Sequence, residues 1–276
     1  MNKSYLMVAG DKQKHLDKIK DLNCSVAIIN LEDGVFDKDF ARELLKTNFE
    51  NQLMKFDTLQ TVVRINDLNT FGKEDIKVIN KLKPNAIRVP KIKTIKDVEI
   101  ALKLIDKDID IHLSIETKEA FKNLSSLKIN KRVTTVYLGI LDLLESLEMP
   151  QSIVHLNNPT IDYILSEFLI KSKIASLNPV SFTYQDYKND KEFILWCKKT
   201  KNMGYKSKSC ISPKQVDIVN KIFAIDDFEI EKALYIKDKF EKQQLKSCSG
   251  FSDEKFGFID EPIYKDALLT LRLNKS

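Results

Sequence analysis

The chain has 276 residues, of which 43% are hydrophobic and 31% charged, a composition typical of a soluble globular protein with one barrel-sized domain or two smaller ones. Its 45 basic and 40 acidic residues leave a net charge of +5, and the two signs alternate along helices, so we expect no nucleic-acid binding. No segment approaches the ~18 apolar residues of a membrane span, and the first residues carry too short an apolar run for a signal peptide. We therefore expect a cytoplasmic protein with no membrane partner.

Short apolar, β-branched runs recur along the chain, and each is typical of a buried strand. In chain order they are residues 4–8, 26–31, 61–65, 86–90, 111–115, 134–138, 174–183 and 208–211. Segments with helical spacing separate them, for example Ile76, Ile79 and Leu82. Because parallel strands need such crossover connections, the alternation predicts an α/β protein. Eight units without a GxGxxG turn favour a (β/α)8 TIM barrel over a doubly wound sheet.

The rhythm of strands and helices stops near residue 226. A charged helix over 229–246 is followed by the segment 247–262, which has no clear pattern, and by a last short helix. We therefore predict a catalytic barrel over 1–225 and a C-terminal helix and lid segment over 226–276. A segment that follows a closed barrel is free to cover its mouth or to reach a neighbouring subunit.

Polar residues follow most of the predicted strands, at the point where each strand ends. In a TIM barrel these carboxyl ends and the loops after them build the active site. In chain order the candidates are Glu32 and Asp33, Arg64 and Asn66, Lys91, Glu116 and Thr117, Gly139 and Asp142, and Ser209 and Ser212. The sequence therefore predicts that several acids, an arginine and a lysine meet at one mouth.

Glu116 and Asp142 follow neighbouring strands and are candidate ligands for Mg²⁺, which binds one or two protein carboxylates and keeps open positions for substrate oxygens. The alternative is that each acid caps the helix after its strand. Arg64 is suited to a substrate carboxylate or a developing oxyanion. Its alternative is a structural salt bridge to Glu32 or Asp33.

Lys91 follows Pro90 and would be a Schiff-base nucleophile only if it were desolvated. The acids around it would keep its amine charged, so an electrostatic or structural role is favoured. The three histidines form no convincing site, and His112 is expected to be a core residue because it lies within the fifth predicted strand.

Eight short segments of the chain resemble, in order, those of the HpcH/HpaI aldolase and citrate lyase family, and in particular its citrate lyase beta-subunit-like branch. "AIINLEDGV" is similar to the family's "vilDLEDAV", "VVRIND" to "vRVN", and "LSIETKEAFKNL" to "liETprGvlna". The others are "KSYLMVAGDKQKHLDK", "AIRVPKIKTIKDV", "VYLGILDLLESL", "GYKSKSCISPKQVDIVNKIF" and "GFSDEKFGFIDEPIYKDALL". Each segment is a weak signal alone, whereas eight in register cover nearly the whole chain.

The resemblance implies a (β/α)8 barrel, a homotrimer or a multiple of it, and a Mg²⁺-dependent enzyme that cleaves or forms a carbon–carbon bond next to a thioester or keto acid. It assigns the metal to Glu116 and Asp142 and substrate binding to Arg64, with Lys91 and Gly139 beside the substrate. Glu32 and Asp33 match an acidic pair near the metal. Asp260 matches an acid of the C-terminal segment, which thioester-cleaving relatives supply across a subunit interface as a lid.

Four positions depart from the family pattern, and two of them are the glycine after "ET", which is Ala120 or nearby, and "DGkM", which is "EKFGF" here. Leu141 stands where the family has an acidic residue before Asp142, and Ser212 stands in place of its "IHP" histidine. These departures leave the acyl group open. We therefore expect a Mg²⁺-dependent lyase that splits a hydroxyacyl thioester of citryl, citramalyl or malyl type, carried by CoA or an acyl carrier protein, into a keto acid and an acyl thioester.

Two other readings of the same sequence stay open. One is a pyruvate-type aldolase that needs no thioester, which a missing requirement for CoA or an acyl carrier protein would indicate. The other is a degenerate barrel kept as a binding or assembly subunit, which the departures at Leu141 and Ser212 favour. An inactive scaffold should show no Mg²⁺ binding that a keto acid enhances.

Overall fold

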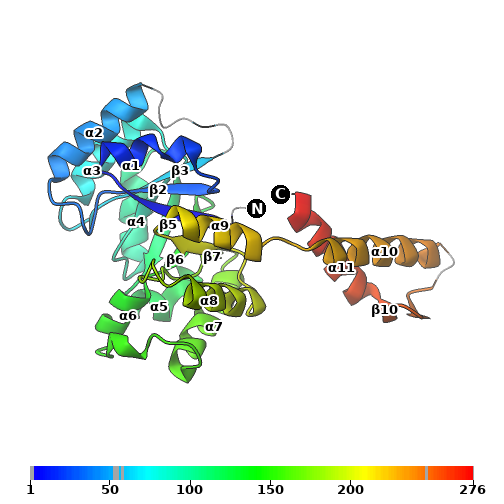
Figure 1. Ribbon diagram of the computed structural model, residues 1–276. Coiled ribbons are helices and arrows are strands. Elements are labelled where there is room, and N and C mark those ends of the chain that lie inside the picture. The colour runs from blue at the N-terminus through cyan, green and yellow to red at the C-terminus, as the bar shows by residue number, and fades with distance from the viewer. Residues whose placement is uncertain (1–2, 52–55, 57–58, 246–247, 276) are drawn as a thin grey trace. The chain divides into compact units, whose positions relative to one another are not determined.

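A computed structural model describes residues 3–51, 56, 59–245 and 248–275 of the chain. It divides into two compact units, one ending at Phe223 and the other spanning residues 224–276. The first unit contains eight strands in one parallel sheet, in the order β7-β6-β5-β4-β3-β2-β1-β8. A parallel bridge between Ser181 and Lys208 joins the two ends of this sheet. The predicted (β/α)8 barrel is therefore confirmed (Figure 1).

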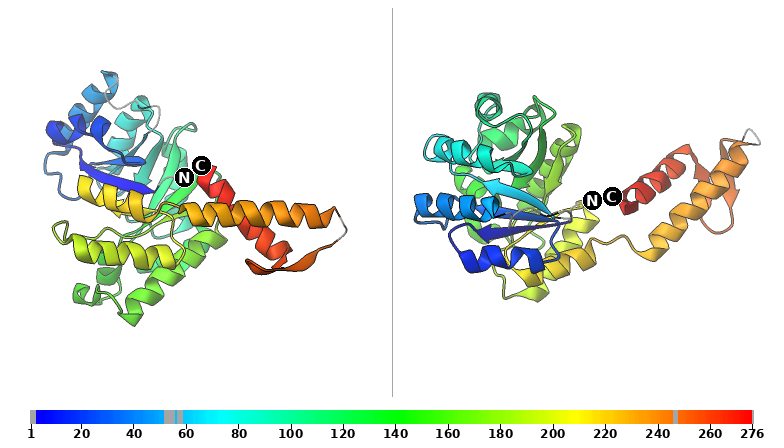
Figure 2. Two further views of the ribbon diagram at one scale, coloured as in Figure 1. Left: turned by 45° about the vertical axis from the view of Figure 1, so that its right-hand side comes forward. Right: turned by 90° about the horizontal axis from the view of Figure 1, so that it is seen from above.

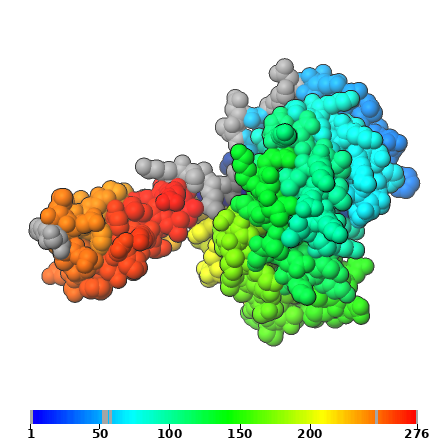
Figure 3. Space-filling view, turned by 180° about the vertical axis from the view of Figure 1, so that it is seen from behind, coloured from blue at the N-terminus to red at the C-terminus, as the bar shows by residue number. Residues whose placement is uncertain are grey.

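The strands of the barrel have the following bounds: β1 Ser4–Ala9, β2 Val26–Asn30, β3 Gln60–Arg64, β4 Ala86–Val89, β5 Asp110–Ile115, β6 Val133–Leu138, β7 Asn178–Val180 and β8 Lys208–Cys210. The helices outside them are α1 Gln13–Asp17, α2 Lys38–Glu50, α3 Gly72–Leu82, α4 Ile95–Leu104, α5 Lys118–Asn123, α6 Ile140–Ser146, α7 Pro159–Ile174, α8 Asp190–Asn202 and α9 Pro213–Ile222. Figure 2 shows the strands inside and the helices around them. In Figure 3 the helices from the middle of the chain, coloured cyan to green, form one continuous outer face of this unit.

The seventh strand is shorter than predicted. The sequence favours strand from residue 174, but Ile174 is the last residue of α7 and only Asn178–Val180 are strand. Ser176 has a positive φ of 54°, which ends the helix in a tight turn. Apolar residues at a helix end and at a strand start form one continuous run in the sequence, and the run alone does not show where the helix stops.

Side chains along most of the barrel strands alternate between two hydrophobic clusters. Outward-facing residues such as Val63 and Ile87 pack against the helices in the large core. Inward-facing residues form a smaller cluster inside the barrel: Tyr5, Val26, Ile28, Val62, Ala86, Tyr137 and Val180. This period-2 pattern determines which residues at the strand ends face the inside of the barrel.

The second unit contains α10 Asp227–Gln244, the strands β9 Gly250–Asp253 and β10 Gly257–Asp260, and α11 Glu261–Lys275. The two strands form an antiparallel hairpin, which the sequence pattern did not predict. Ala233, Ile236, Phe240, Ile259 and Ala267 form a separate small core in this unit. Among the described residues, no helix of either unit is long and apolar enough to cross a bilayer.

Candidate active site at the carboxyl ends of the strands

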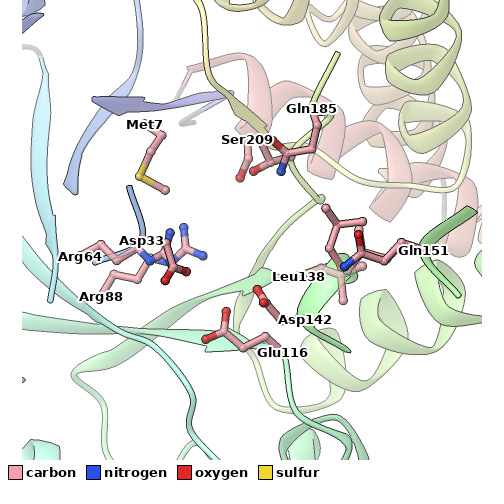
Figure 4. A pocket seen from close by; sticks show the side chains of 14 residues that line it. Met7, Asp33, Arg64, Arg88, Glu116, Leu138, Asp142, Gln151, Gln185 and Ser209 are labelled. Carbon is pink, nitrogen blue, oxygen red and sulfur yellow. The ribbon is translucent and has the colours of Figure 1, made fainter. Parts of the chain in front are cut away.

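A cavity of about 310 Å³ lies at the carboxyl ends of the barrel strands (Figure 4). Residues from or directly after six strands line it, and most of them are polar or charged. The lining residues are Met7, Asp33, Arg64, Arg88, Glu116, Leu138, Gly139, Ile140, Leu141, Asp142, Gln151, Thr183, Gln185 and Ser209. Six of the residues predicted for the site are therefore brought together: Asp33, Arg64, Glu116, Gly139, Asp142 and Ser209.

Glu116 and Asp142 come from neighbouring β/α units and flank the same glycine. Glu116 directly follows β5, and its Oε1 accepts a hydrogen bond of 2.7 Å from the backbone N–H of Lys91. Asp142 lies in the first turn of α6, which begins directly after Gly139. A Cβ added at Gly139 would stand 2.8 Å from Oε2 of Glu116 and 3.7 Å from Oδ2 of Asp142. Only the contacts to Glu116 are too short for a real side chain, so glycine at this position leaves room for the Glu116 carboxylate.

Burial raises the pKa of both carboxyl groups. For Glu116, desolvation is the main cause, and the nearby guanidinium groups of Arg88 and Arg64 act in the opposite direction. For Asp142, desolvation is again the main cause, and the negative charge of Asp33 adds to it. Two carboxylates in a poorly solvated cavity become stable as anions when a cation lies between them.

The pair fits Mg²⁺ better than a transition metal. Mg²⁺ needs only one or two protein carboxylates, because water and substrate oxygens complete its six ligands. The described part of the chain holds no cluster of three or more His, Cys, Asp or Glu side chains that could bind a metal. The donors that Glu116 and Asp142 offer are carboxylate oxygen atoms, the hard ligands that Mg²⁺ prefers.

Arg64 is the last residue of β3 and pairs with both acids of the "LEDG" segment. Its Nη2 forms an ion pair with Oε2 of Glu32 and lies 3.0 Å from Oδ2 of Asp33. Burial lowers the pKa of Arg64 to about 10, and the positive charge of Arg88 is the next largest cause. The salt bridges expected as the alternative role of Arg64 are therefore present, while its side chain also lines the cavity.

The two acids beside Arg64 lie in different surroundings. The side chain of Glu32 is 6% exposed and does not line the cavity, whereas that of Asp33 is 65% exposed and does. Asn30 holds the turn between them, because its Nδ2 donates to the carbonyl of Asp33 and its Oδ1 accepts from the N–H of Glu32. Gly34, with a φ of +83°, then lets the chain turn away.

Arg88 was not among the predicted site residues, yet it lines the cavity next to Arg64. It lies on β4, where Arg64 and Arg88 are register partners. It was missed because only strand ends were considered, and Arg88 lies inside the fourth apolar run. A charged residue two positions after the inward-facing Ala86 was the signal that could have identified it.

Other predicted residues have positions outside the cavity lining. The side chain of Lys91 is exposed. Its backbone, which is left-handed with a φ of 51°, instead donates the N–H that holds the Glu116 carboxylate. Ser212 caps α9 by accepting a hydrogen bond from the N–H of Gln215. Asp260 belongs to the C-terminal unit, where its Oδ1 accepts a hydrogen bond from the N–H of Ile263.

Several known proteins resemble this chain in sequence or in structure. A (3S)-malyl-CoA thioesterase of Cereibacter sphaeroides is 28% identical over 234 residues, which are 84% of this chain and 80% of that protein. The mitochondrial citramalyl-CoA lyase of Homo sapiens is 22% identical over 99% of this chain and 86% of its own length. The crystal structure of protein CitE from Mycobacterium tuberculosis, in complex with magnesium, acetoacetate and coenzyme A, superposes with a TM-score of 0.78 at 18% identity. It covers 100% of this chain and 98% of that one.

A match to a family model covers most of the chain. Residues 3–213 match the family model described as HpcH/HpaI aldolase/citrate lyase, and this range contains the whole cavity lining. It therefore includes both carboxylates that flank Gly139 and both arginines beside them. On this match over most of its length, the chain belongs to the HpcH/HpaI aldolase/citrate lyase family.

Proposed function

We propose that this protein is a Mg²⁺-dependent carbon–carbon lyase that splits a hydroxyacyl thioester of citryl, citramalyl or malyl type into a keto acid and an acyl thioester. The observation that carries the proposal is the cavity in which the buried Glu116 and the half-buried Asp142 share a space with Arg64 (Figure 4). Family membership and the names of the relatives, a citramalyl-CoA lyase among them, support the same chemistry.

Glu116 and Asp142 are the residues that would hold Mg²⁺. When bound, the ion would act as a Lewis acid and as a template for a hydroxy acid. Glu116 is fixed for this role by the N–H of Lys91, and Gly139 leaves the space that the Glu116 carboxylate needs.

The remaining charged residues fit the steps of a carbon–carbon cleavage. Asp33 lines the cavity and is exposed enough to pass protons to water, so it accepts the proton of the substrate hydroxyl. As the hydroxyl carbon becomes a ketone, the electron pair of the broken bond moves to the acyl half, where negative charge collects on the thioester oxygen. Arg64 stabilises that oxygen by donating hydrogen bonds. Glu32, which is buried against Arg64, holds the guanidinium in place.

A complete active site is proposed to need more than one copy of the chain. In the proposed homotrimer, Asp260 of one copy completes the cavity of another and supplies the proton that the acyl half takes up after cleavage. Mixing inactive Asp142→Ala and Asp260→Asn proteins tests this directly, because mixed oligomers then contain some intact sites. Recovered activity after subunit exchange is expected, and no recovery despite exchange would contradict a shared site. The expected cytoplasmic location stays a prediction, which cell fractionation tests.

A second candidate activity is hydrolysis of the thioester. The relative with 28% identity is a malyl-CoA thioesterase, and in such a reaction water attacks the thioester carbon and free CoA leaves. A thioesterase releases a free thiol and an intact hydroxy acid, whereas a lyase releases a keto acid and keeps the thioester bond. Measuring both products in one assay separates the two activities.

The experiment that tests the proposed function is a panel of citryl-, citramalyl- and malyl-CoA, each with Mg²⁺ and with a chelator. We expect at least one thioester to release its keto acid in the presence of Mg²⁺, with no free thiol formed and no keto acid released under chelation. The same hydroxy acids without CoA serve as the control for an aldolase that needs no thioester. Metal-independent release, or no release from any member of the panel, would contradict the proposal.

A further inference from the structure

Arg88 is a deeply buried cation of the cavity that has no ion-pair partner in the described part of the chain. The residue is 5% exposed. Its Nε donates a 2.8 Å hydrogen bond to the Oγ of Ser114, and its guanidinium carbon lies 4.1 Å from the ring centroid of Tyr137. The side chain of Arg88 makes no other hydrogen bond and no ion pair with a residue in the described part of the chain.

The register partners of Arg88 do not offset its charge. Glu116 and Asp142 attract it across the cavity, but neither forms an ion pair with it in the described part of the chain, and both are the carboxylates proposed to hold Mg²⁺. His112, its register partner on β5, has a pKa lowered to about 3 by burial and is neutral at physiological pH. Arg64, its partner on β3, carries the same charge and is already paired with Glu32 and Asp33. Because an unpaired buried charge is strongly unfavourable, the arrangement calls for an anion from outside the chain.

The free edge of Arg88 determines what kind of anion fits. With Nε bound to Ser114, the terminal nitrogens Nη1 and Nη2 remain, and in Figure 4 the side chain extends towards the same space as Arg64 and Glu116. Two parallel N–H groups match a carboxylate that has both oxygen atoms free. A carboxylate that chelates a metal ion has only one such oxygen, so Arg88 is suited to a different carboxylate of the ligand.

The depth of Arg88 indicates which half of the ligand carries this carboxylate. A CoA or protein carrier is too large for a cavity of about 310 Å³ and must extend out through its mouth. The acyl half, which is bonded to the carrier, therefore lies towards the mouth, near the exposed Asp33. The keto-acid half lies deeper, where Arg88 is.

We propose that Arg88 is a specificity-determining residue that binds a second carboxylate on the keto-acid half of the substrate. The protein thereby selects a dicarboxylic keto acid, of the oxaloacetate type, over a monocarboxylic one such as pyruvate or glyoxylate. This inference rests on the proposed lyase function, because it assumes that the metal pair binds the first carboxylate.

The test compares the binding of matched ligands to the wild-type protein and to Arg88→Met, with saturating Mg²⁺, by calorimetry. Malate and lactate differ by one carboxylate and are stable towards Mg²⁺, and oxaloacetate and pyruvate form the corresponding keto pair. We expect wild-type protein to bind malate and oxaloacetate at least about 10-fold more tightly than lactate and pyruvate. In Arg88→Met the dicarboxylates should lose about 10- to 100-fold in affinity, with the monocarboxylates changed by less than about threefold.

Two further variants keep the result interpretable if Arg88→Met folds poorly. Arg88→Lys keeps the charge but removes the two parallel N–H groups of the guanidinium. We therefore expect intermediate affinity for the dicarboxylates and a native melting curve. Lys103→Met removes an exposed charge of α4 outside the cavity and should change none of the affinities.

Each outcome bears on a different claim. Equal losses for both classes of ligand in Arg88→Met would show that Arg88 binds the shared carboxylate, which overturns this inference and leaves the lyase function standing. Equal affinity of the wild-type protein for both classes overturns it as well. Wild-type protein that binds none of the four ligands with Mg²⁺ would instead contradict the proposed function and, with it, the inference.

Discussion

The two ends of the barrel interior are built from the same strands and have opposite chemistry. Towards the amino ends, inward-facing side chains such as Val62 and Ala86 form a dry apolar cluster. Two residues further along the same strands, Arg64 and Arg88 line the cavity with charge. A core that served stability alone would continue the apolar layers, because buried charges are costly. The charged second layer therefore agrees with the proposed function, because a bound anion or cation would offset the cost of these buried charges.

The largest effect is expected from removing one carboxylate of the charged layer. Asp142→Ala should lower the rate of Mg²⁺-dependent keto-acid release by about 10³-fold or more, because a lost metal ligand removes several kcal/mol of transition-state stabilisation. Glu145→Ala, which removes an exposed carboxylate from the same helix outside the cavity lining, is the matched control. The rate of Glu145→Ala should stay within about twofold of wild type, because a surface substitution away from the active site usually has a small effect. An unchanged rate in Asp142→Ala would refute the metal assignment.

The next effect comes from filling the space between the two carboxylates. Gly139→Ala places a methyl group 2.7 Å from Cβ and 2.8 Å from Oε2 of Glu116, so the carboxylate must move. Affinity for Mg²⁺, measured by calorimetry, should fall about 10- to 100-fold, the range known for disturbed supports of metal ligands. The apo variant should keep a native circular dichroism spectrum. Wild-type affinity in this variant would show that Gly139 has no part in positioning Glu116.

The two acids beside Arg64 should differ in their effect on stability. Glu32→Gln weakens a buried ion pair, and we expect the free energy of unfolding to fall by about 2 kcal/mol, as when a buried charged partner is lost. Asp33→Asn weakens an exposed pair and should cost less than about 1 kcal/mol. Urea denaturation of both variants measures the difference. Equal losses would contradict the distinct surroundings of the two side chains.

The smallest effect is a pH dependence of stability. Because the pKa values of Glu116 and Asp142 are raised in the folded apo protein, both groups favour folding when protonated and disfavour it as pH rises through the raised values. Mg²⁺ binds only the ionised forms, so it should raise the melting temperature at neutral pH. This increase should shrink as pH falls towards the ordinary carboxyl range of about 4 to 5. A magnesium effect that grows on acidification would contradict the assignment.

The sequence predicted the barrel because hydrophobic periodicity and the alternation of strands and helices are local signals. It also placed Asp33, Arg64, Glu116, Gly139 and Asp142 together, since parallel topology brings strand ends to one face. Two features depended on tertiary structure instead. A list of strand ends cannot contain Arg88, which lies inside a strand, and side-chain chemistry alone cannot show that Lys91 contributes its backbone N–H to Glu116.

The C-terminal unit shows a third limit of the sequence. Its long helix was predicted, but the β9–β10 hairpin was not, because short strands with exposed residues such as Phe258 lack a clean alternation of apolar and polar positions. Asp260 was assigned to the site only through the family resemblance, and its part in catalysis stays a proposal.

The most direct test of the central claim is a crystal of the protein soaked with Mn²⁺ as a stand-in for Mg²⁺, with anomalous data collected to locate the ion. We predict one strong peak in the cavity, with a carboxylate oxygen of Glu116 and one of Asp142 as ligands at about 2.0 to 2.2 Å. A cavity without a peak in crystals that bind Mn²⁺ elsewhere, or a peak bound by neither carboxylate, would contradict it.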